Sequence, residues 1–240
     1  MEATLQGAAC AHPESTPLAG QCWPNRAEAD ARSAISDFPP DPRRATSRAY
    51  CREQAMDSFR ITLAQMNPTV GDIRGNADKA RAAWEQGKRD GADLVALPEM
   101  FLAGYQCQDL IRRPAFVDDL ARAATELAAA CADGPALGIG LPWRTEQALH
   151  NAYLILEGGT IRSKVFKHEL PNNGVFDEHR LFAPGDIHGP IAIKGVRIGV
   201  PICEDAWHED VAEALAESGA EFLFVPNGSP YTRSKRDQRM

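Results

Sequence analysis

The sequence lacks a long apolar run, a cluster of basic residues and any closely paired cysteines. No stretch approaches the roughly eighteen apolar residues that a membrane helix requires, and the N-terminus has no basic start followed by an apolar core. We therefore expect a cytoplasmic protein with no membrane partner. The formal net charge is −7, and a phosphate-binding surface needs clustered Lys and Arg, so nucleic acid is not expected as a partner either.

The spacing of the cysteines argues against two further classes of protein. The six cysteines lie at positions 10, 22, 51, 107, 131 and 203, with neither CxxC pairs nor the dense spacing of small secreted domains. A metal site and a disulfide framework are therefore both unexpected.

The overall composition is typical of a soluble globular protein, since 44% of the residues are apolar and 25% are charged. A length of 240 residues suits one large α/β domain or two small ones.

The first 57 residues differ from the rest of the chain. They contain six of the seventeen prolines and show no sustained apolar periodicity. We expect a disordered N-terminal extension here. Met56 directly precedes the first strand-like segment, so the extension is either a dispensable tail or the product of a wrongly assigned start. Residues 58–240 contain no internal repeat and no linker, and we expect them to form one domain that stops early.

After residue 58, strand and helix signals alternate. The expected strands are 59–65, 93–97, 136–141, 151–156, 160–166, 190–194, 196–202 and 221–225; the expected helices are 77–89, with Asn76 as N-cap, 116–131, and one from His208 onward. Strand, helix and strand in succession predict a βαβ unit within an α/β fold. Gly158-Gly159 and Gly195 each predict a hairpin, so the sheets are expected to be mixed.

Cys203 lies where the strand 196–202 gives way to a helix. A side chain on such a turn is held clear of the sheet, and the N–H groups that follow it point toward any bound ligand. This position suits a nucleophile. The alternative is an ordinary buried cysteine, which is the more common state of a lone cysteine.

Glu99, Lys167 and Cys203 each follow the end of an apolar strand. Because ligands of α/β sheets bind beyond strand ends, the three side chains are expected to meet. Glu99 would act as general base for the thiol and then as acid for a leaving amine, while Lys167 would lower the pKa of the thiol and stabilise an anionic intermediate. Cys203 would attack a carbonyl or nitrile carbon. Taken singly, Glu99 could instead cap a turn, and Lys167 could be a solvated surface residue.

Three sequence blocks carry a resemblance to a known family. They read LVALPEMFLAGY around Glu99, SKVFKHELPNNGVFDE around Lys167 and IGVPICEDAWHED around Cys203. In this order they resemble the signature blocks of the carbon–nitrogen hydrolase (nitrilase) superfamily. More narrowly, LPNNGVFDEHRLFAPG, CEDAW and VPNGSPY are similar to the glutamine-hydrolysing domain of glutamine-dependent NAD synthetases. The resemblance extends over roughly residues 59–240.

This resemblance implies a nitrilase-like αββα sandwich. It also implies that glutamine is hydrolysed through a thioester without a cofactor, and that the ammonia passes to a synthetase domain that amidates nicotinic acid adenine dinucleotide with ATP and Mg²⁺. No Ser-Gly-Gly-x-Asp-Ser type loop occurs in the sequence, so the synthetase domain is expected to be absent and this chain alone is not expected to make NAD. The sandwich is expected to be incomplete at its C-terminal end, and its unpaired sheet edge favours a homo-oligomer.

The resemblance also assigns roles to residues. It makes Cys203 the nucleophile, Glu99 the base and Lys167 the residue that stabilises the intermediate, with no metal ligands. The residues implied near the substrate are Tyr105, Glu178 (a second carboxylate), Glu204 (through its backbone N–H), Ser229 and Tyr231. Asp205 and Trp207 are expected to be structural, the Trp filling space beside the turn. The segment GYQCQDLI departs from the family pattern around Cys107, whose thiol we expect to be a bystander.

Two other functions stay open at this stage. The chain could be a free-standing amidase or nitrilase that acts on another small amide, or a catalytically silent module that only assembles with partners. The blocks LPN…FDE and NGSPY favour glutamine hydrolysis over the first of these.

Overall fold

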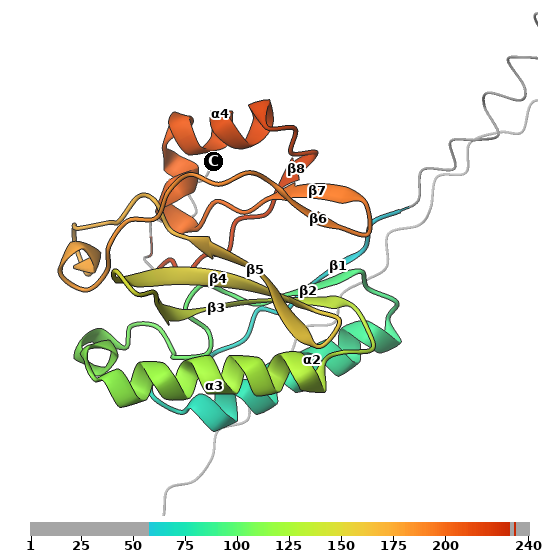
Figure 1. The fold of residues 1–240 in the computed structure, drawn as a ribbon, viewed down its shortest axis with the longest axis horizontal. Coiled ribbons are helices and arrows are strands. Elements are labelled where there is room, and N and C mark those ends of the chain that lie inside the picture. The colour runs from blue at the N-terminus through green and yellow to red at the C-terminus, as the bar shows by residue number, and fades with distance from the viewer. Residues whose placement is uncertain (1–57, 231–232, 234–240) are drawn as a thin grey trace, which may run out of the picture. The chain divides into compact units, whose positions relative to one another are not determined.

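The computed structural model describes residues 58–230 and Arg233. The predicted extension over residues 1–57, and Tyr231, lie outside the described residues. Residues 58–230 fold into four layers: two helices, a five-stranded sheet, a three-stranded sheet and a further helix (Figure 1). This arrangement confirms the predicted αββα sandwich.

Both sheets are mixed, as the two glycine hairpins predicted. The five-stranded sheet has the order β1 (Ile61–Leu63), β2 (Leu94–Ala96), β3 (Ala136–Arg144), β4 (Leu149–Glu157) and β5 (Thr160–Phe166). Its first three strands run parallel, and its last three alternate in direction. The second sheet has the order β6 (Ile191–Ile193), β7 (Val196–Gly199) and β8 (Phe222–Leu223), with β6 antiparallel and β8 parallel to β7.

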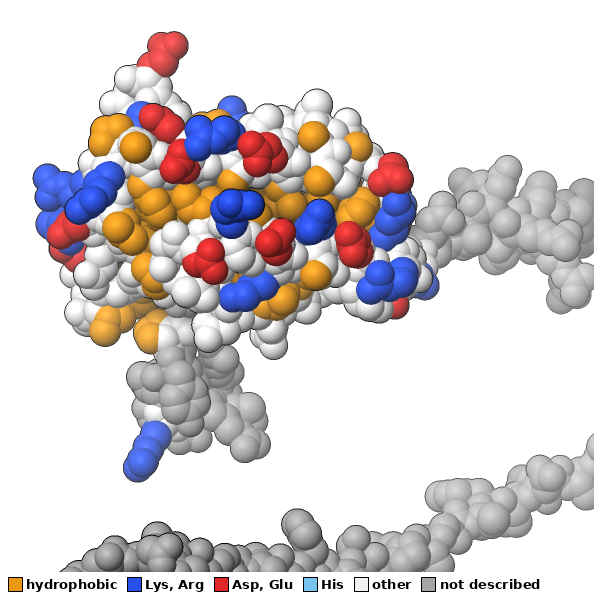
Figure 2. Space-filling view, turned by 90° about the horizontal axis from the view of Figure 1, so that it is seen from below, with side chains coloured by type: hydrophobic (Ala, Val, Ile, Leu, Met, Phe, Trp, Pro, Cys, Tyr) orange, Lys and Arg blue, Asp and Glu red, His pale blue; other side chains and the backbone are white. Residues whose placement is uncertain are grey.

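Three α-helices cover the outer faces of the sheets. Helices α2 (Ile73–Arg89) and α3 (Pro114–Ala130) lie side by side against the five-stranded sheet, and α4 (Glu209–Glu217) lies on the three-stranded sheet (Figure 1). On the side of α2 and α3, acidic and basic side chains are interspersed around apolar ones (Figure 2). None of the helices within the described residues has both the length and the apolar character needed to span a membrane.

Helix α2 begins earlier than the sequence pattern predicted. The side chain of Asp72 caps it by accepting the Gly75 N–H at 3.0 Å, so Asp72 and not Asn76 is the N-cap. Asn76 lies inside the helix and is fully buried. Its Nδ2 donates to the carbonyls of Thr69 and Leu102, which fastens two loops to the helix. The prediction that Asn76 caps the helix was therefore wrong, because its side-chain amide instead holds two loops against the helix.

The core has two parts, one on each face of the five-stranded sheet. Strand β4 contributes to both: Leu154 and Leu156 pack under the helices, while Tyr153 and Ile155 pack between the sheets. Alternate side chains of a strand point to opposite faces, so a strand buried on both sides reads as a continuous apolar run. A polar residue on this strand, such as Asn151, is consequently excluded from water.

Candidate active site

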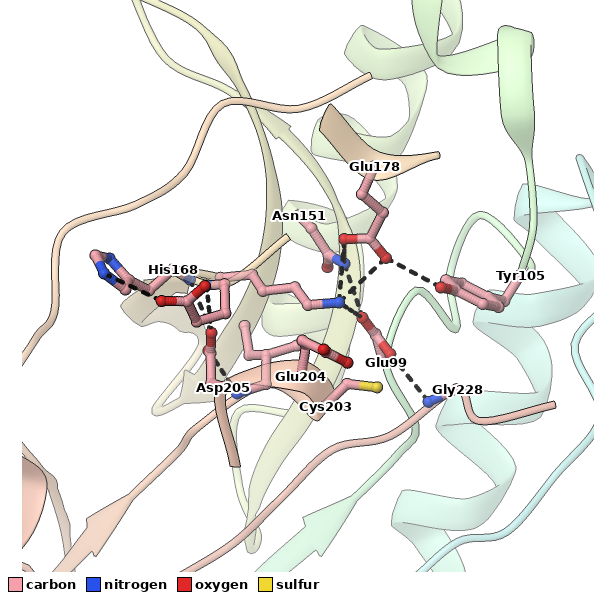
Figure 3. Close-up of polar contacts among 12 residues, drawn as sticks. Glu99, Tyr105, Asn151, His168, Glu178, Cys203, Glu204, Asp205 and Gly228 are labelled. Carbon is pink, nitrogen blue, oxygen red and sulfur yellow. Dashed lines mark hydrogen bonds and ion pairs between the residues drawn. The ribbon is translucent and has the colours of Figure 1, made fainter. Parts of the chain in front are cut away.

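Cys203 begins a short 3-10 helix, Cys203–Trp207, that follows β7. Its backbone φ of 50° lies in the left-handed region, which side-chain-bearing residues adopt only under constraint from their surroundings. Its N–H donates to the Pro226 carbonyl at 3.0 Å, and Sγ donates to Asn227 Oδ1 at 3.3 Å. The thiol is thus buried and held in one direction, toward the carboxylate of Glu99 (Figure 3).

Glu99 lies in the segment that leaves β2 and passes close over β3. A Cβ at Gly140 of β3 would lie 2.3 Å from the Met100 nitrogen, so this close approach requires glycine. Glu99 is 1% exposed. Its Oε2 accepts the Gly228 N–H at 3.0 Å, and its Oε1 accepts Asn151 Nδ2 at 2.8 Å.

Lys167 follows β5, and its ammonium lies between two carboxylates. Nζ is 2.9 Å from Glu99 Oε1 and 3.0 Å from Glu178 Oε2, and the side chains of Lys167 and Glu99 are fully buried. The structure therefore brings Glu99, Lys167 and Cys203 together from three separate strand ends. Figure 3 shows Glu99 beside Cys203. The catalytic roles of the three residues stay predictions.

The charged side chains of this group shift one another's pKa values. Burial alone would lower the pKa of Lys167, but the nearby Glu99 and Glu178 carboxylates outweigh burial and raise it, so the amine stays charged. Burial and the charge of Glu99 raise the pKa of Glu178, against the attraction of Lys167. The ammonium thus compensates two carboxylates that would otherwise repel each other.

The predicted effect of Lys167 on the thiol was incomplete. Burial, and then repulsion from Glu99, raise the pKa of Cys203 to about 12, while Lys167 and the Gly228 N–H pull it down by less. The effect of the cation was predicted from the sequence, whereas burial and the Glu99 charge oppose it. At neutral pH the resting thiol is therefore protonated, and a base would have to take its proton before it could act as a nucleophile.

The residues predicted around the substrate lie at different depths. Tyr105 OH donates to Glu178 Oε1 at 3.0 Å, so both belong to the buried group. Glu204 is half-buried, and its backbone N–H is the second of the 3-10 helix, where N–H groups lack a partner within the helix. Ser229 is half-buried and its N–H donates to Asn227 Oδ1 at 2.8 Å. Tyr231 lies outside the described residues.

Asp205 connects the two segments that carry Lys167 and Cys203. Its Oδ1 accepts the N–H groups of His168 at 3.1 Å and Glu169 at 2.7 Å, and its Oδ2 accepts the Ile202 N–H at 2.8 Å. Asp205 is buried, which agrees with its expected structural role. Trp207 does not fill space beside the turn, because its side chain is 72% exposed.

Three site residues were not singled out from the sequence. Asn151 reads as part of an apolar strand, and no local pattern marks it. Asn227 and Gly228 lie in the block VPNGSPY, which was recognised as a whole but whose Asn and Gly were given no role. The structure shows that the Asn227 side chain and the Gly228 N–H contact Cys203 and Glu99, respectively.

A pocket opens beside the buried carboxylates, and its lining includes Tyr105, Cys107, Glu178 and Arg180. Burial raises the pKa of Cys107 to about 12.

A group of possible metal ligands lies elsewhere on the surface, where His168, Glu169 and Asp210 each place one ligand atom within 4.8 Å of the others. Asp210 is exposed, and surface groups of this composition are common without an ion.

Known proteins share this sequence pattern and this fold. The carbon–nitrogen hydrolase family pattern matches residues 60–240. The glutamine-dependent NAD(+) synthetase of Rhodobacter capsulatus is 57% identical over 183 residues, which cover 76% of this chain and 33% of that protein. The structure of glutamine-dependent NAD+ synthetase from Acinetobacter baumannii, in complex with ADP, superposes with a TM-score of 0.69 at 32% identity, over 75% of this chain and 34% of that one.

An amidase from Nesterenkonia sp. shows the same fold, with a TM-score of 0.65 at 22% identity over 74% of this chain and 68% of that one. The chain spans about a third of the length of the two synthetases that it matches. The family pattern, the four-layer fold and the buried Glu99, Lys167 and Cys203 agree with one another, and this chain belongs to the carbon–nitrogen hydrolase family.

Proposed function

We propose that this chain hydrolyses glutamine to glutamate and ammonia through a thioester on Cys203. The observation that carries the proposal is the water-excluded group in which Glu99 faces the Cys203 thiol and contacts the Lys167 ammonium (Figure 3). A buried base beside a protonated thiol can activate it without solvent. The relatives that share this part of the chain carry the name glutamine-dependent NAD(+) synthetase.

Attack begins when Cys203 Sγ transfers its proton to Glu99 and bonds to the amide carbon. The amide π electrons move to oxygen, which becomes an oxyanion. Lys167 donates two N–H groups to carboxylates, and its ammonium has a third that can reach this oxyanion. The Glu204 N–H at the start of the 3-10 helix is the second donor of this oxyanion hole.

Collapse of the intermediate breaks the carbon–nitrogen bond. Glu99 returns its proton to the leaving nitrogen, so ammonia departs and an acyl thioester remains on Cys203. Glu99 then accepts a proton from water, whose oxygen attacks the thioester carbon. Glutamate leaves and the proton returns to sulfur, which restores the resting thiol.

Tyr105, Glu178 and Ser229 belong to the substrate side of the site in this proposal, and Tyr231 keeps its predicted place there. The ammonia would feed the ATP-dependent amidation of nicotinic acid adenine dinucleotide in a synthetase domain, with Mg²⁺ used in that domain and no cofactor in the glutaminase reaction. The relatives' names and their greater length support this second step.

The test is Cys203→Ala in the full-length parent protein that includes the synthetase domain, with Cys131→Ala as the matched control. Cys131 is a buried cysteine at the C-terminal end of α3, and its charged neighbours are Arg81, Glu85 and Asp133. The first variant should release no glutamate from glutamine, while NAD formation from free ammonia continues; the control should retain both activities. Glutamate release by Cys203→Ala at the wild-type rate would refute the proposed nucleophile, and failure of the wild type on glutamine but not on another small amide would identify an amidase.

A further inference from the structure

Asn151 contacts every charged member of the buried group. It lies on β4 and is fully buried. Its Nδ2 donates to Glu99 Oε1 at 2.8 Å and faces Glu178 Oε2 at 3.4 Å, and its backbone carbonyl accepts the Lys167 N–H at 2.9 Å. Figure 3 shows the Asn151 amide beside the Glu99 and Glu178 carboxylates.

The direction of this amide is set by its neighbours. Both partners of Nδ2 are carboxylate oxygens, which can only accept, so turning the amide would place Oδ1 against them. In the direction observed, Oδ1 is buried without a hydrogen-bond partner among the described residues. A buried acceptor in that state costs stability. Asn151 is therefore not explained as a stabilising residue.

Asn76 provides the comparison within the same molecule. It is also a fully buried asparagine, but its Oδ1 accepts the Thr69 N–H at 2.8 Å and its Nδ2 donates to two carbonyls. All of its polar atoms serve the fold. Asn151 instead leaves an acceptor unsatisfied in order to present its donor to Glu99 and Glu178.

The charge balance of the group explains why a neutral donor is needed here. Glu99 and Glu178 face one ammonium, so their two negative charges are compensated by a single positive charge. A carboxylate at position 151 would add repulsion, whereas an amide N–H favours the ionised carboxylates without adding charge. Besides Lys167, the titratable groups among the described residues that interact with the two carboxylates include Tyr105, Cys107 and Cys203.

We propose that Asn151 is a positioning residue that holds the Glu99 and Glu178 carboxylates at a fixed separation, so that Glu99 is oriented to take the Cys203 proton. The inference rests on the proposed function, because it assigns a role in that reaction. Asn151 acts through Glu99 and does not contact the reacting carbon.

The experiment compares Asn151→Ala and Asn151→Asp with Asn76→Ala in the native protein. Both Asn151 variants should lower kcat for glutamine about 100-fold with little change in KM. The acid limb of the pH profile of kcat/KM should move up by about one unit, since a carboxylate that loses a donor binds a proton more readily. Asn76→Ala should reduce thermal stability and leave the pH profile of the folded enzyme unchanged.

A second readout separates this proposal from the proposed function. Alkylation of Cys203 by iodoacetamide, followed at peptide level, needs no substrate. Its rate at fixed pH should fall at least about threefold in Asn151→Ala, because the Glu99 charge is then less neutralised and disfavours the thiolate. Asn76→Ala should keep the wild-type rate.

If the wild type does not hydrolyse glutamine but the alkylation rates differ as stated, the proposed function fails and the positioning role stands. If either Asn151 variant is folded and keeps the wild-type alkylation rate and pH profile, the positioning role is wrong. Asn151→Asp preserves the size of the side chain, so it serves as the test should Asn151→Ala fail to fold.

Discussion

The ammonium of Lys167 lies 2.9 Å from the Glu99 carboxylate, and both side chains are fully buried. Each ion depends on the other, because an isolated charge in this environment would be strongly destabilised. Glu178 adds a second carboxylate to the same ammonium at 3.0 Å. Removal of the lysine should therefore change both the charge of the site and the stability of the fold.

We expect Lys167→Met to lower the free energy of unfolding by about 3–5 kcal/mol at neutral pH, because two buried carboxylates lose their cation. The pKa of Glu178 is already raised in the folded protein, and this substitution raises it further. A carboxyl group whose pKa is higher in the folded than in the unfolded protein destabilises the fold as the pH rises from the unfolded-state pKa through the folded-state pKa. The deficit should therefore be largest at neutral pH and shrink toward the unfolded-state value of 4.5.

Urea unfolding at about pH 7.5 and about pH 5 measures this difference. The matched control is Lys194→Met, since Lys194 forms an ion pair with Asp93 at 2.7 Å but is 58% exposed. An exposed pair is worth less than about 1 kcal/mol, so the control should change little at either pH. A deficit in Lys167→Met that does not depend on pH would show that packing, and not charge, is responsible.

The sequence predicted the elements better than the contacts between them. The strand 160–166 and the hairpin at Gly158-Gly159 were correct, because their signals are local. The placement of Glu99, Lys167 and Cys203 at strand ends was also visible from alternating segments. Each of these inferences uses only neighbouring residues and a known periodicity.

Features that depend on distant residues were missed or wrong. Burial and the proximity of Glu99, which is far away in the sequence, decide the pKa of Cys203. Asn151 meets Glu99 across 52 positions of the chain, so no local pattern marks it. Trp207 was expected to be packed, and its exposure follows from the direction of a turn that side-chain type does not determine.

Replacement of Glu99 should have opposite effects on the thiol and on turnover. The pKa of Cys203 is raised by burial and then by the Glu99 charge, so Glu99→Gln should lower it, by about one unit, and speed alkylation. Glutamine hydrolysis should nevertheless fall roughly 100-fold or more, since the base is lost. Peptide-level alkylation across a pH series, with Glu126→Gln on the exposed face of α3 as control, measures the thiol. Slower alkylation in Glu99→Gln would mean that this carboxylate does not act on the thiol.

Gly140 tests whether the path of the chain after Glu99 matters. An alanine Cβ there would lie 2.3 Å from the Met100 nitrogen, and backbone cannot move aside as a side chain can. We expect Gly140→Ala to cost about 1–3 kcal/mol and to reduce kcat by displacing Glu99. Gly189→Ala is the control, because a Cβ at Gly189 meets nothing within 4 Å. Thermal melts and kcat for both variants decide the matter, and wild-type kcat in Gly140→Ala would show that Glu99 tolerates the displacement.

Asp205 tests whether the Lys167 and Cys203 segments must be held together. Its carboxylate accepts the N–H groups of His168, Glu169 and Ile202, so Asp205→Ala leaves one buried and two half-buried donors without this acceptor. The free energy of unfolding should fall by at least about 2 kcal/mol. Asp205→Asn keeps one oxygen acceptor and should lie between Asp205→Ala and the wild type, while Asp118→Ala on the exposed side of α3 should match the wild type.

The effect of Asp205→Ala on kcat shows whether Asp205 fixes the geometry of the site or only stabilises the fold. If it fixes Lys167 relative to Cys203, kcat for glutamine should drop about 100-fold in Asp205→Ala even at a temperature where the variant is fully folded. Conditions that stabilise the fold should not restore kcat, because the lost contacts fix the distance between Lys167 and Cys203 and not the fraction of folded protein. A variant that is less stable but retains wild-type kcat would show that Lys167 and Cys203 keep their geometry without Asp205, through the two sheets alone.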